Sequence, residues 1–396
     1  MAPSSTTKSF RTLAKVSAAA LLASFASVSC GSDEGDGAGK AGSAGTGGTS
    51  TSGSGGTGGT IVGAGTGGIA TGQSDSSLAD PCRGIELPKN DYYVAPGLCV
   101  RAVALNQGEL RQITFASNGD LIGVKVQGNV VRYRDLDDNG AFGGDEIVEL
   151  GKTGDGHGNN AHFDEDAGYL YAGSPDGVVR FAYTSDMDKL GDREDVVVGE
   201  PSTGTHIFHT VHVYDGWLYV HSGSENNAVA PMSPDYDTNR AVLKRFRLSD
   251  FTPGTPLEWS NGEIIARGIR NMVGFKQNAA GRMYGVINGM DDLTYGGADV
   301  HLDNPGDDVV LLEPGLEHGY PYCFTAAHIE LDNGMVTAGT QLVSATDPAA
   351  PDPDFVNPHD DAWCAANSEP PATFVVPHSA PLDIVFHDGL EGNLPS

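Results

Sequence analysis

The sequence predicts an all-β domain organised as a propeller of four-stranded antiparallel blades. A unit made of a turn and a following strand of alternating or aromatic residues recurs four times, with turn glycines at Gly119, Gly168, Gly216 and Gly281. Successive glycines are 49, 48 and 65 residues apart. A period of about 50 residues in a β-rich chain is typical of propeller blades, and few windows show the periodicity of an amphipathic helix.

Further strands are expected on both sides of these units, because the flanking segments are rich in β-branched and aromatic residues. They lie at 110–116 and 210–213 before the turns, and at 130–134, 178–182 and 243–248 after the units. Asp388 and Gly389 are expected to start another copy.

The first 29 residues have the features of an export signal. Three basic residues precede an apolar stretch, 16–29, which is too short to span a bilayer as a helix. Small residues then precede Cys30, as at the cleavage site of a bacterial lipoprotein, so Cys30 is the expected lipidation site. Ser27 stands where such sites usually have Leu, and an ordinary secretory signal with an incidental cysteine is the alternative.

Residues 30–80 are rich in Gly, Ser, Thr and Ala and carry too few apolar side chains to offset the entropy of ordering. We expect a disordered tether between the lipid and a domain at 81–396. The formal net charge of −29 argues against nucleic acid and anionic lipid as partners. The expected location is the periplasm or the cell surface, with the membrane reached only through the lipid anchor.

Four cysteines remain besides Cys30, an even number in an exported chain. Three pairings are possible. We favour Cys82 with Cys99 and Cys323 with Cys364, because each of these pairs closes a shorter loop rich in Pro or Gly. The cysteines and histidines lack zinc-type spacing, so neither zinc nor thiol chemistry is expected.

An acidic loop after the first repeat matches the pattern of a calcium-binding loop. Asp135, Asp137 and Asn139 alternate before a glycine, and Glu146 is the twelfth residue. Alternating side-chain oxygens and a terminal carboxylate suit a large hard cation. Flanking helices are not expected, so this would be a calcium loop between strands. The alternative is an acidic hairpin turn.

A later stretch combines several motifs that together resemble one known family. Gly-Ile-Arg-Asn at 268–271 is followed by Asn-Gly-Met-Asp-Asp at 288–292, an acidic pair at 307–308, and Gly-Leu-Glu-His-Gly-Tyr-Pro-Tyr-Cys at 315–323. This combination resembles the glucose/sorbosone dehydrogenase family, the soluble quinoprotein sugar dehydrogenases, from about Gly97 to the C-terminus. The resemblance implies a six-bladed propeller with pyrroloquinoline quinone (PQQ) and calcium.

The resemblance also implies roles for particular residues. The family's general base aligns with His206, and His209 is the second candidate; a neutral imidazole suits proton removal from a sugar hydroxyl. Arg270 and Asn271 would reach the carbonyl oxygens of the quinone, where a guanidinium stabilises negative charge. The alternative for Arg270 is a structural role, bound to the carbonyls of a turn.

Metal ligands are implied at the next loop. Main-chain carbonyls at Gly289 and Met290 would help to hold the calcium that bridges to PQQ, and Met290 stands where the family commonly has Pro. Four carboxylates would hold a second, structural calcium, or else lie at the surface without a metal. They are Asp291, Asp292, Asp307 and Asp308.

The chain departs from the family near its end. Residues 377–386 resemble the family's His-Ser-Ala-Pro-Leu segment, after which the family continues with further strands that bring basic residues to the site. This sequence stops at Ser396, so we expect the last blade to be incomplete.

The resulting hypothesis is an exported enzyme that oxidises a sugar, an aldose or a sorbosone-like aldehyde or polyol, with PQQ and calcium. It would pass electrons to an external acceptor. The alternative is a non-catalytic cell-surface propeller that binds carbohydrate or protein. A weaker third possibility is a lactone hydrolase, which would need a ring of carboxylates around a central metal.

Overall fold

The computed structural model describes residues 85–86, 100–154, 160–207, 209–228, 239–331, 334–346 and 356–386. The export signal, Cys30, the tether, Cys82, Cys99 and the copy expected at Asp388 lie outside these residues. The chain divides into two compact units, Met1–Arg101 and Ala102–Ser396. Where the first unit ends, β1 (Ile85–Glu86) and β2 (Arg101–Ala102) form a two-stranded sheet. A search of the described residues finds no helix with the length and apolar character that a membrane span needs.

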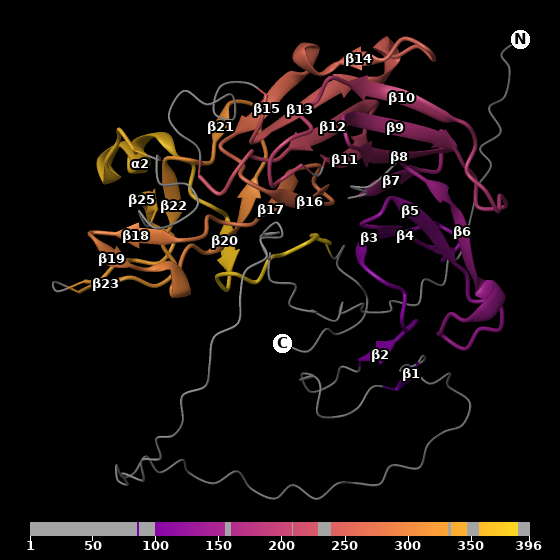
Figure 1. The fold of residues 1–396 in the computed structure, drawn as a ribbon, viewed down its shortest axis with the longest axis horizontal. Coiled ribbons are helices and arrows are strands. Elements are labelled where there is room, and N and C mark those ends of the chain that lie inside the picture. The colour runs from indigo at the N-terminus through magenta and orange to yellow at the C-terminus, as the bar shows by residue number, and fades with distance from the viewer. Residues whose placement is uncertain are drawn as a thin grey trace, which may run out of the picture. The chain divides into compact units, whose positions relative to one another are not determined.

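The second unit is built on four antiparallel sheets, which follow one another in chain order (Figure 1). The first contains β3 (Leu110–Phe115), β4 (Leu121–Lys125), β5 (Asn129–Tyr133) and β6 (Ile147–Lys152). The second contains β7 (Ala161–Asp164), β8 (Tyr169–Ser174), β9 (Gly177–Ala182) and β10 (Arg193–Val198), with β14 (Leu257–Glu258) added in parallel.

The third and fourth sheets follow the same plan. The third contains β11 (His209–Tyr214), β12 (Trp217–Ser222), β13 (Val242–Arg247) and β15 (Glu263–Arg267), with β21 (Leu316–Glu317) added in parallel. The fourth contains β16 (Met272–Gln277), β17 (Met283–Ile287), β20 (Asp307–Leu311) and β27 (Thr373–Val375).

The predicted turn glycines lie between the first and second strands of the four sheets. Gly119, Gly168, Gly216 and Gly281 have φ of 90°, 71°, 73° and 77°, respectively. Glycine adopts this left-handed backbone without the steric cost that a Cβ brings. The repeat read from these glycines is therefore confirmed as a repeat of hairpins that start each sheet.

The sheets meet through their first strands. Strand β3 contacts β7, β7 contacts β11, and β11 contacts β16. Each sheet thus has its first strand innermost, followed outward by its second, third and fourth strands, which is the arrangement of propeller blades. The all-β propeller class predicted from the sequence is confirmed.

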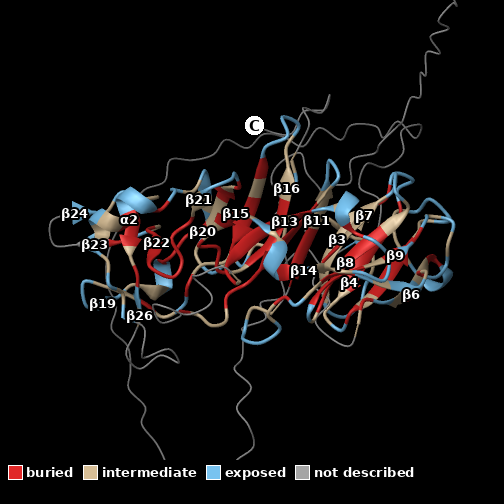
Figure 2. Ribbon diagram, turned by 90° about the horizontal axis from the view of Figure 1, so that it is seen from above, coloured by how far each residue is buried: buried red, intermediate tan, exposed pale blue. Residues whose placement is uncertain are grey.

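Apolar side chains from neighbouring sheets fill the space between them. Three clusters each contain buried residues of two neighbouring sheets. Val124 and Leu170 belong to the first, Val178 and Leu218 to the second, and Leu243 and Phe275 to the third. The second strands are buried on both faces, as β8 illustrates (Figure 2), so their sequences are mostly apolar without strict alternation. Burial of these strands fixes the register of each blade.

Polar side chains line the innermost strands instead. The rings of His162 and His212 lie 4.5 Å apart, and His212 Nε2 lies 2.6 Å from Gln277 Oε1. Lys276 forms a 2.8 Å ion pair with Asp383. This ion pair attaches the C-terminal segment that contains Asp383 to the innermost strand of the fourth sheet.

Two insertions interrupt the fourth sheet. Between β17 and β20 lie β18 (Leu293–Tyr295), β19 (Ala298–Asp299) and the 3-10 helix η4 (His301–Asp303). Between β20 and β27, besides β21, lie β22 (Cys323–Thr325), β23 (Glu330–Leu331), β24 (Gly334–Met335), β25 (Gln341–Val343), β26 (Ala345–Thr346) and α2 (Asp361–Asn367). The other 3-10 helices among the described residues are η1 (Gly144–Glu146), η2 (Leu248–Asp250) and η3 (Trp259–Asn261).

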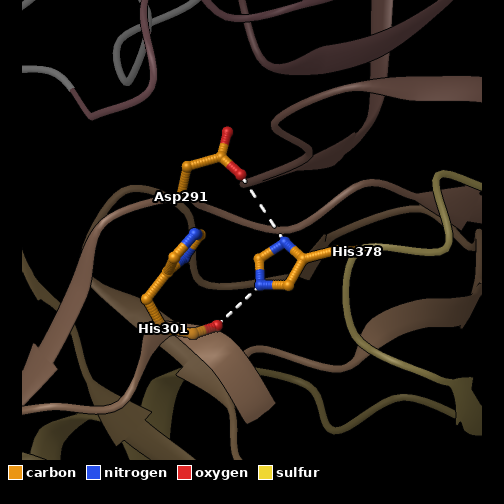
Figure 3. A group of neighbouring side chains, drawn as sticks. All are labelled: Asp291, His301 and His378. Carbon is orange, nitrogen blue, oxygen red and sulfur yellow. Dashed lines mark hydrogen bonds and ion pairs between the residues drawn. The ribbon is translucent and has the colours of Figure 1, made fainter. Parts of the chain in front are cut away.

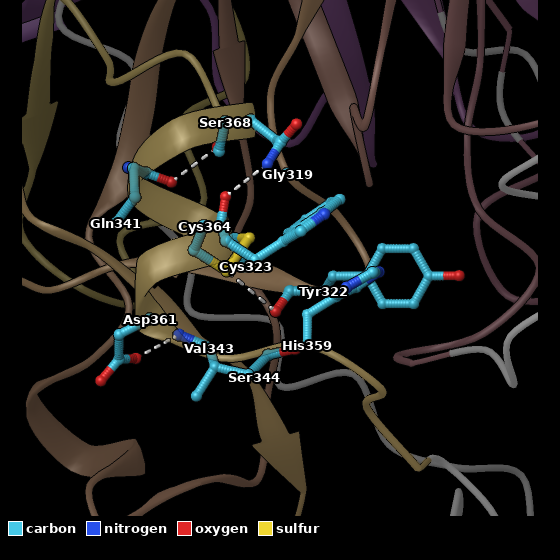
Figure 4. Close-up of a disulfide and its surroundings, with 12 residues drawn as sticks. Gly319, Tyr322, Cys323, Gln341, Val343, Ser344, His359, Asp361, Cys364 and Ser368 are labelled. Atoms are coloured by element: carbon cyan, nitrogen blue, oxygen red, sulfur yellow. Dashed lines mark hydrogen bonds between the residues drawn. A yellow bond between two sulfur atoms is a disulfide. The ribbon is translucent and has the colours of Figure 1, made fainter.

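A disulfide joins β22 to α2 inside the longer insertion (Figure 4). Cys323 and Cys364 are 41 residues apart in sequence, and both are buried. Asp360 caps the helix by accepting a hydrogen bond from Trp363 N–H at 2.9 Å. The structure thus joins the second of the two cysteine pairs favoured from the sequence.

Candidate active site

Polar residues gather where the chain enters the innermost strands. His206 precedes β11 by three residues, and Arg270 and Asn271 directly precede β16. His378 precedes the C-terminal segment that is attached to β16 through Asp383. Since connections between rigid strands present functional groups, this group of residues is the candidate site.

The tautomer of His206 follows from its hydrogen bonds. His206 Nδ1 lies 2.7 Å from Ser224 Oγ, and the Ser224 hydroxyl donates to the Asn226 carbonyl at 2.7 Å. A carbonyl oxygen only accepts, so the Ser224 hydroxyl proton is donated to the Asn226 carbonyl. Ser224 Oγ must then accept a hydrogen bond from His206 Nδ1–H. A neutral His206 therefore has its lone pair on Nε2, which is the form that can remove a proton.

The charge state of His206 is set by its surroundings. Burial, followed by the positive charge of Arg270 and the nearby His221, holds the pKa of His206 well below its usual value of 6.5. Each of these factors disfavours the charged imidazolium. His206 is consequently neutral at neutral pH and able to accept a proton.

Arg270 is buried and fully hydrogen-bonded. Its Nε donates to Asn227 O at 3.1 Å, Nη1 donates to Asn288 O at 3.3 Å and Gly289 O at 2.5 Å, and Nη2 donates to Asn227 Oδ1 at 2.9 Å and Asp291 Oδ2 at 3.1 Å. These contacts use all five N–H donors of the guanidinium. Arg270 thus has the structural arrangement that was the alternative in the sequence analysis, while its charge still acts on His206.

Gly289 links the site to the fourth sheet. Its N–H donates to Asp307 Oδ1 at 2.9 Å, and its carbonyl accepts from Arg270. A Cβ at this position would lie 2.2 Å from Pro305 Cγ, so the close approach requires glycine. The loop is therefore held from both sides at this residue.

Asn271 and Met290 have less specific surroundings. The Asn271 carbonyl accepts from Asn288 N–H at 2.9 Å, which extends the pairing of β16 with β17. The Met290 side chain is buried in an apolar cluster with Leu293 and Tyr320. Burial of Met290 leaves its backbone as the part that could act at the site.

Asp307 is a structural carboxylate. It is buried, and besides Gly289 it accepts hydrogen bonds from Ala380 N–H at 2.9 Å and Ser379 Oγ at 3.2 Å. Burial raises the pKa of Asp307, and the backbone hydrogen bonds offset part of that rise. Asp307 thereby ties the Gly289 loop to the segment that carries His378.

The four carboxylates expected to share one calcium do not meet. Asp308 is partly buried and accepts a hydrogen bond from the Thr325 hydroxyl at 2.7 Å, and desolvation raises its pKa to about 7. Asp291 is exposed, and the Asp292 backbone donates to His301 Nδ1 at 3.0 Å. Successive residues of a strand point to opposite faces of the sheet, so the side chains of Asp307 and Asp308 leave β20 on opposite sides. Among the described residues these four carboxylates do not form a candidate metal-binding group, so the structure does not support a single four-carboxylate calcium site.

His209 differs from His206 in accessibility. It is the first residue of β11, only 1% exposed, with Nδ1 2.6 Å from Glu200 Oε1 and Nε2 3.4 Å from the Pro175 carbonyl. Both ring nitrogens face protein groups in the interior. The geometry favours His206 over His209 as a base.

The acidic loop at 135–146 lies between β5 and β6, as expected for a calcium loop between strands. Ligand atoms of Asp135, Asp137 and Glu146 lie within 4.8 Å of one another. Asn139 Oδ1 accepts from Ala141 N–H at 2.7 Å, and its Nδ2 donates to Asp137 at 2.9 Å. Three of the four predicted ligands are thus brought together.

Two residues of the site were not singled out from the sequence. Ser224 sets the tautomer of His206, but a serine 18 residues away carries no pattern that links it to a histidine. His378 lies in the His-Ser-Ala-Pro-Leu segment, which was noted for its resemblance without a role for the histidine. His378 faces Asp291, with Nδ1 3.6 Å from Oδ1.

Comparison with known proteins places the chain among quinoprotein relatives. The TrAA12-like family model matches residues 92–393. The chain is 27% identical over 333 residues to a pyrroloquinoline quinone-dependent pyranose dehydrogenase of Coprinopsis cinerea, covering 81% of this chain and 44% of that protein. It is 27% identical over 314 residues to a pyrroloquinoline quinone-dependent sugar dehydrogenase of Hypocrea jecorina, covering 74% of this chain and 70% of that protein. The chain thus spans less than half of the Coprinopsis protein.

Solved structures show the same fold. The holo PQQ domain of the Coprinopsis cinerea pyranose dehydrogenase matches with a TM-score of 0.64 and 25% identity, over 77% of this chain and 74% of that one. A calcium structure of a Trichoderma reesei family AA12 protein matches with a TM-score of 0.62 and 24% identity, over 72% and 71%.

Proposed function

The chain belongs to the TrAA12-like family of PQQ-dependent sugar dehydrogenases, and from this premise we propose that it oxidises a sugar, with His206 as the general base. The substrate class is an aldose or a related pyranose, in keeping with the names of the relatives. The electrons leave to an external acceptor. The enzyme acts outside the cytoplasm, anchored by a lipid on Cys30 through the tether at 30–80.

The observation that carries this proposal is the state of His206. A half-buried ring that is kept neutral by its surroundings, with Nδ1–H donated to Ser224, has a single basic atom, Nε2. No partner for Nε2 lies among the residues that the structure describes. Proton abstraction from a sugar hydroxyl needs such a base in its unprotonated form.

His206, Ser224 and Arg270 have different roles in the proposed reaction. Nε2 of His206 removes the hydroxyl proton of the sugar, and Ser224 holds the ring in the required tautomer. The positive charge of Arg270 keeps His206 neutral before reaction, and its hydrogen bonds hold the loop at 288–291 in place. PQQ, when bound, supplies the acceptor for the hydride that leaves the sugar carbon.

The residues implied at PQQ differ in how well they suit it. His206 lies just before β11 and Asn271 just before β16, so a PQQ bound at the entry of these innermost strands would be within their reach. A direct contact from Arg270 to the quinone does not fit this arrangement, because all five N–H donors are already bonded to protein groups. Arg270 is accordingly assigned as a positioning and electrostatic residue.

The residues of the two expected calcium sites differ in how well they suit calcium. Calcium on the Gly289 carbonyl would lie against the guanidinium of Arg270, which already donates to that oxygen, so the loop at Gly289 and Met290 fits calcium poorly. The loop with Asp135, Asp137 and Glu146 offers converging carboxylates, as calcium prefers. We assign calcium to that loop, as a structural ion.

One observation favours the alternative of a non-catalytic binding propeller. Arg270 is the positive group that the resemblance implied at the quinone, and here it serves the loop instead. A propeller with this arrangement could keep its fold and lose the cofactor. Cofactor binding therefore separates the two functions.

The test is reconstitution of the purified chain with PQQ and calcium. We expect saturable PQQ binding and dye reduction that depends on both PQQ and a pyranose. Absence of PQQ binding by the folded protein would contradict the enzymatic proposal and favour the binding propeller.

A further inference from the structure

A cluster of Asp291, His301 and His378 includes one residue of the candidate site, His378, but has no part in the proposed proton transfer (Figure 3). The three come from separate segments: the loop after β17, helix η4 and the chain before the C-terminal segment. One ligand atom of each lies within 4.8 Å of the other two. We propose that these residues form a binding site for a first-row divalent transition metal, with Zn²⁺ as its representative.

The tautomer of His378 supports metal binding. His378 Nε2 lies 2.6 Å from the His301 carbonyl, and since a carbonyl only accepts, Nε2 carries the proton. The lone pair is then on Nδ1, which faces Asp291 Oδ1 at 3.6 Å. A metal-bound histidine ordinarily donates its other ring N–H to a carbonyl or carboxylate in this way.

The distance between His378 Nδ1 and Asp291 Oδ1 suits two ligands of one metal ion better than it suits a hydrogen bond. A charge-assisted N–H···O bond is roughly 2.7–2.9 Å long, so 3.6 Å is too long for a shared proton. For metal–ligand bonds of about 2.0–2.2 Å, two ligands of a tetrahedral ion are roughly 3.3–3.6 Å apart. The observed separation of Nδ1 and Oδ1 lies within that range of ligand–ligand distances.

The second oxygen of Asp291 is oriented by a partner outside the cluster. Arg270 Nη2 donates to Asp291 Oδ2 at 3.1 Å, which leaves Oδ1 directed at His378. Hydrogen bonds of this kind fix the direction of a carboxylate ligand. Arg270 thus connects the cluster to the site that contains His206.

His301 is the weaker third ligand. Its Nδ1 accepts from Asp292 N–H at 3.0 Å, and its ring lies 4.3 Å from that of His378. Coordination through His301 exchanges this backbone hydrogen bond for a metal bond. Loss of His301 should therefore weaken binding less than loss of His378.

The ligand chemistry sets the class of metal. Imidazole nitrogen suits Zn²⁺, Cu²⁺ and Ni²⁺, whereas calcium takes oxygen ligands. The side chains of Asp291 and His378 are 53% and 33% exposed, so solvent reaches the fourth position. A site with three protein ligands and one open position has the form of reactive rather than structural zinc sites.

The test is calorimetric titration of the tag-free, metal-stripped full chain with Zn²⁺ in a non-coordinating buffer. We expect one saturable site, weakened at least about 100-fold in His378→Ala and about tenfold in His301→Ala. The exposed His328 lies outside the cluster, so His328→Ala should bind Zn²⁺ like the parent. Excess Ca²⁺ should not displace the Zn²⁺.

Melting of the metal-free variants checks that they fold. If His378→Ala melts below the parent, Asp291→Asn serves as the second variant and should show a comparable loss of Zn²⁺ affinity. Absence of saturable binding by the folded parent, undiminished affinity in a folded His378→Ala or Asp291→Asn variant, or displacement by Ca²⁺ would overturn the proposal. These measurements need no PQQ, so their outcome is independent of the proposed oxidation.

Discussion

Ser224→Ala tests whether the tautomer of His206 matters for turnover. The substitution removes the acceptor of His206 Nδ1–H and the hydroxyl that donates to Asn226. The imidazole can then place its proton on either nitrogen, and only the form with a free Nε2 is active. One hydrogen bond contributes about 0.5–1.5 kcal/mol, so kcat/KM should fall about two- to tenfold.

The assay is PQQ-dependent dye reduction with a saturating cofactor, measured across pH 5 to 8. Ser222→Ala is the matched control, because Ser222 is buried two residues away and its Oγ has no hydrogen-bond partner among the described residues. We expect parental turnover in the control. Unchanged kcat/KM and an unchanged pH profile in Ser224→Ala would refute the tautomer argument.

Three predictions concern stability. Replacing Cys323 and Cys364 by Ala should lower the free energy of unfolding by about 4 kcal/mol, because the bridge closes a loop of 41 residues; a loss under about 1 kcal/mol in urea unfolding would contradict this. Burial lowers the pKa of His221 to about 4. The free energy of unfolding is therefore unaffected by this histidine above pH 6.5 and decreases as the pH falls towards 4. His221→Asn should then remove about 2 kcal/mol of the stability difference between pH 7 and pH 5, and an unchanged difference would show that His221 does not bind the proton. Glu200→Ala should destabilise the fold by about 1–3 kcal/mol, since it leaves the buried His209 Nδ1 without the carboxylate that faces it; a melting temperature equal to that of the parent would show that this contact does not stabilise the fold.

The propeller could be predicted from sequence because its signal is local. A glycine with positive φ is needed at each tight turn, and Gly168 and Gly216 each meet that need before a buried strand. The longer spacing to Gly281 has a structural reason: the third sheet carries long connections between β12 and β15. Periodicity alone could not give the insertion that delays β27.

The site was predictable only in part. Motif position identified His206 and Arg270, and the structure brings them close enough for the charge of Arg270 to act on His206. The direction in which the Arg270 donors point depends on the loop at 288–291, which no motif specifies. His378 joined the group only once the fold had brought it to Asp291.

The central claim is tested most directly by His206→Gln. Gln keeps a polar side chain of similar reach and cannot act as a base near neutral pH. If His206 removes the proton from the sugar, the variant should bind PQQ as the parent does while its sugar-dependent dye reduction falls at least about 100-fold. Parental turnover in a variant that binds PQQ normally would contradict the assignment of His206 as the base.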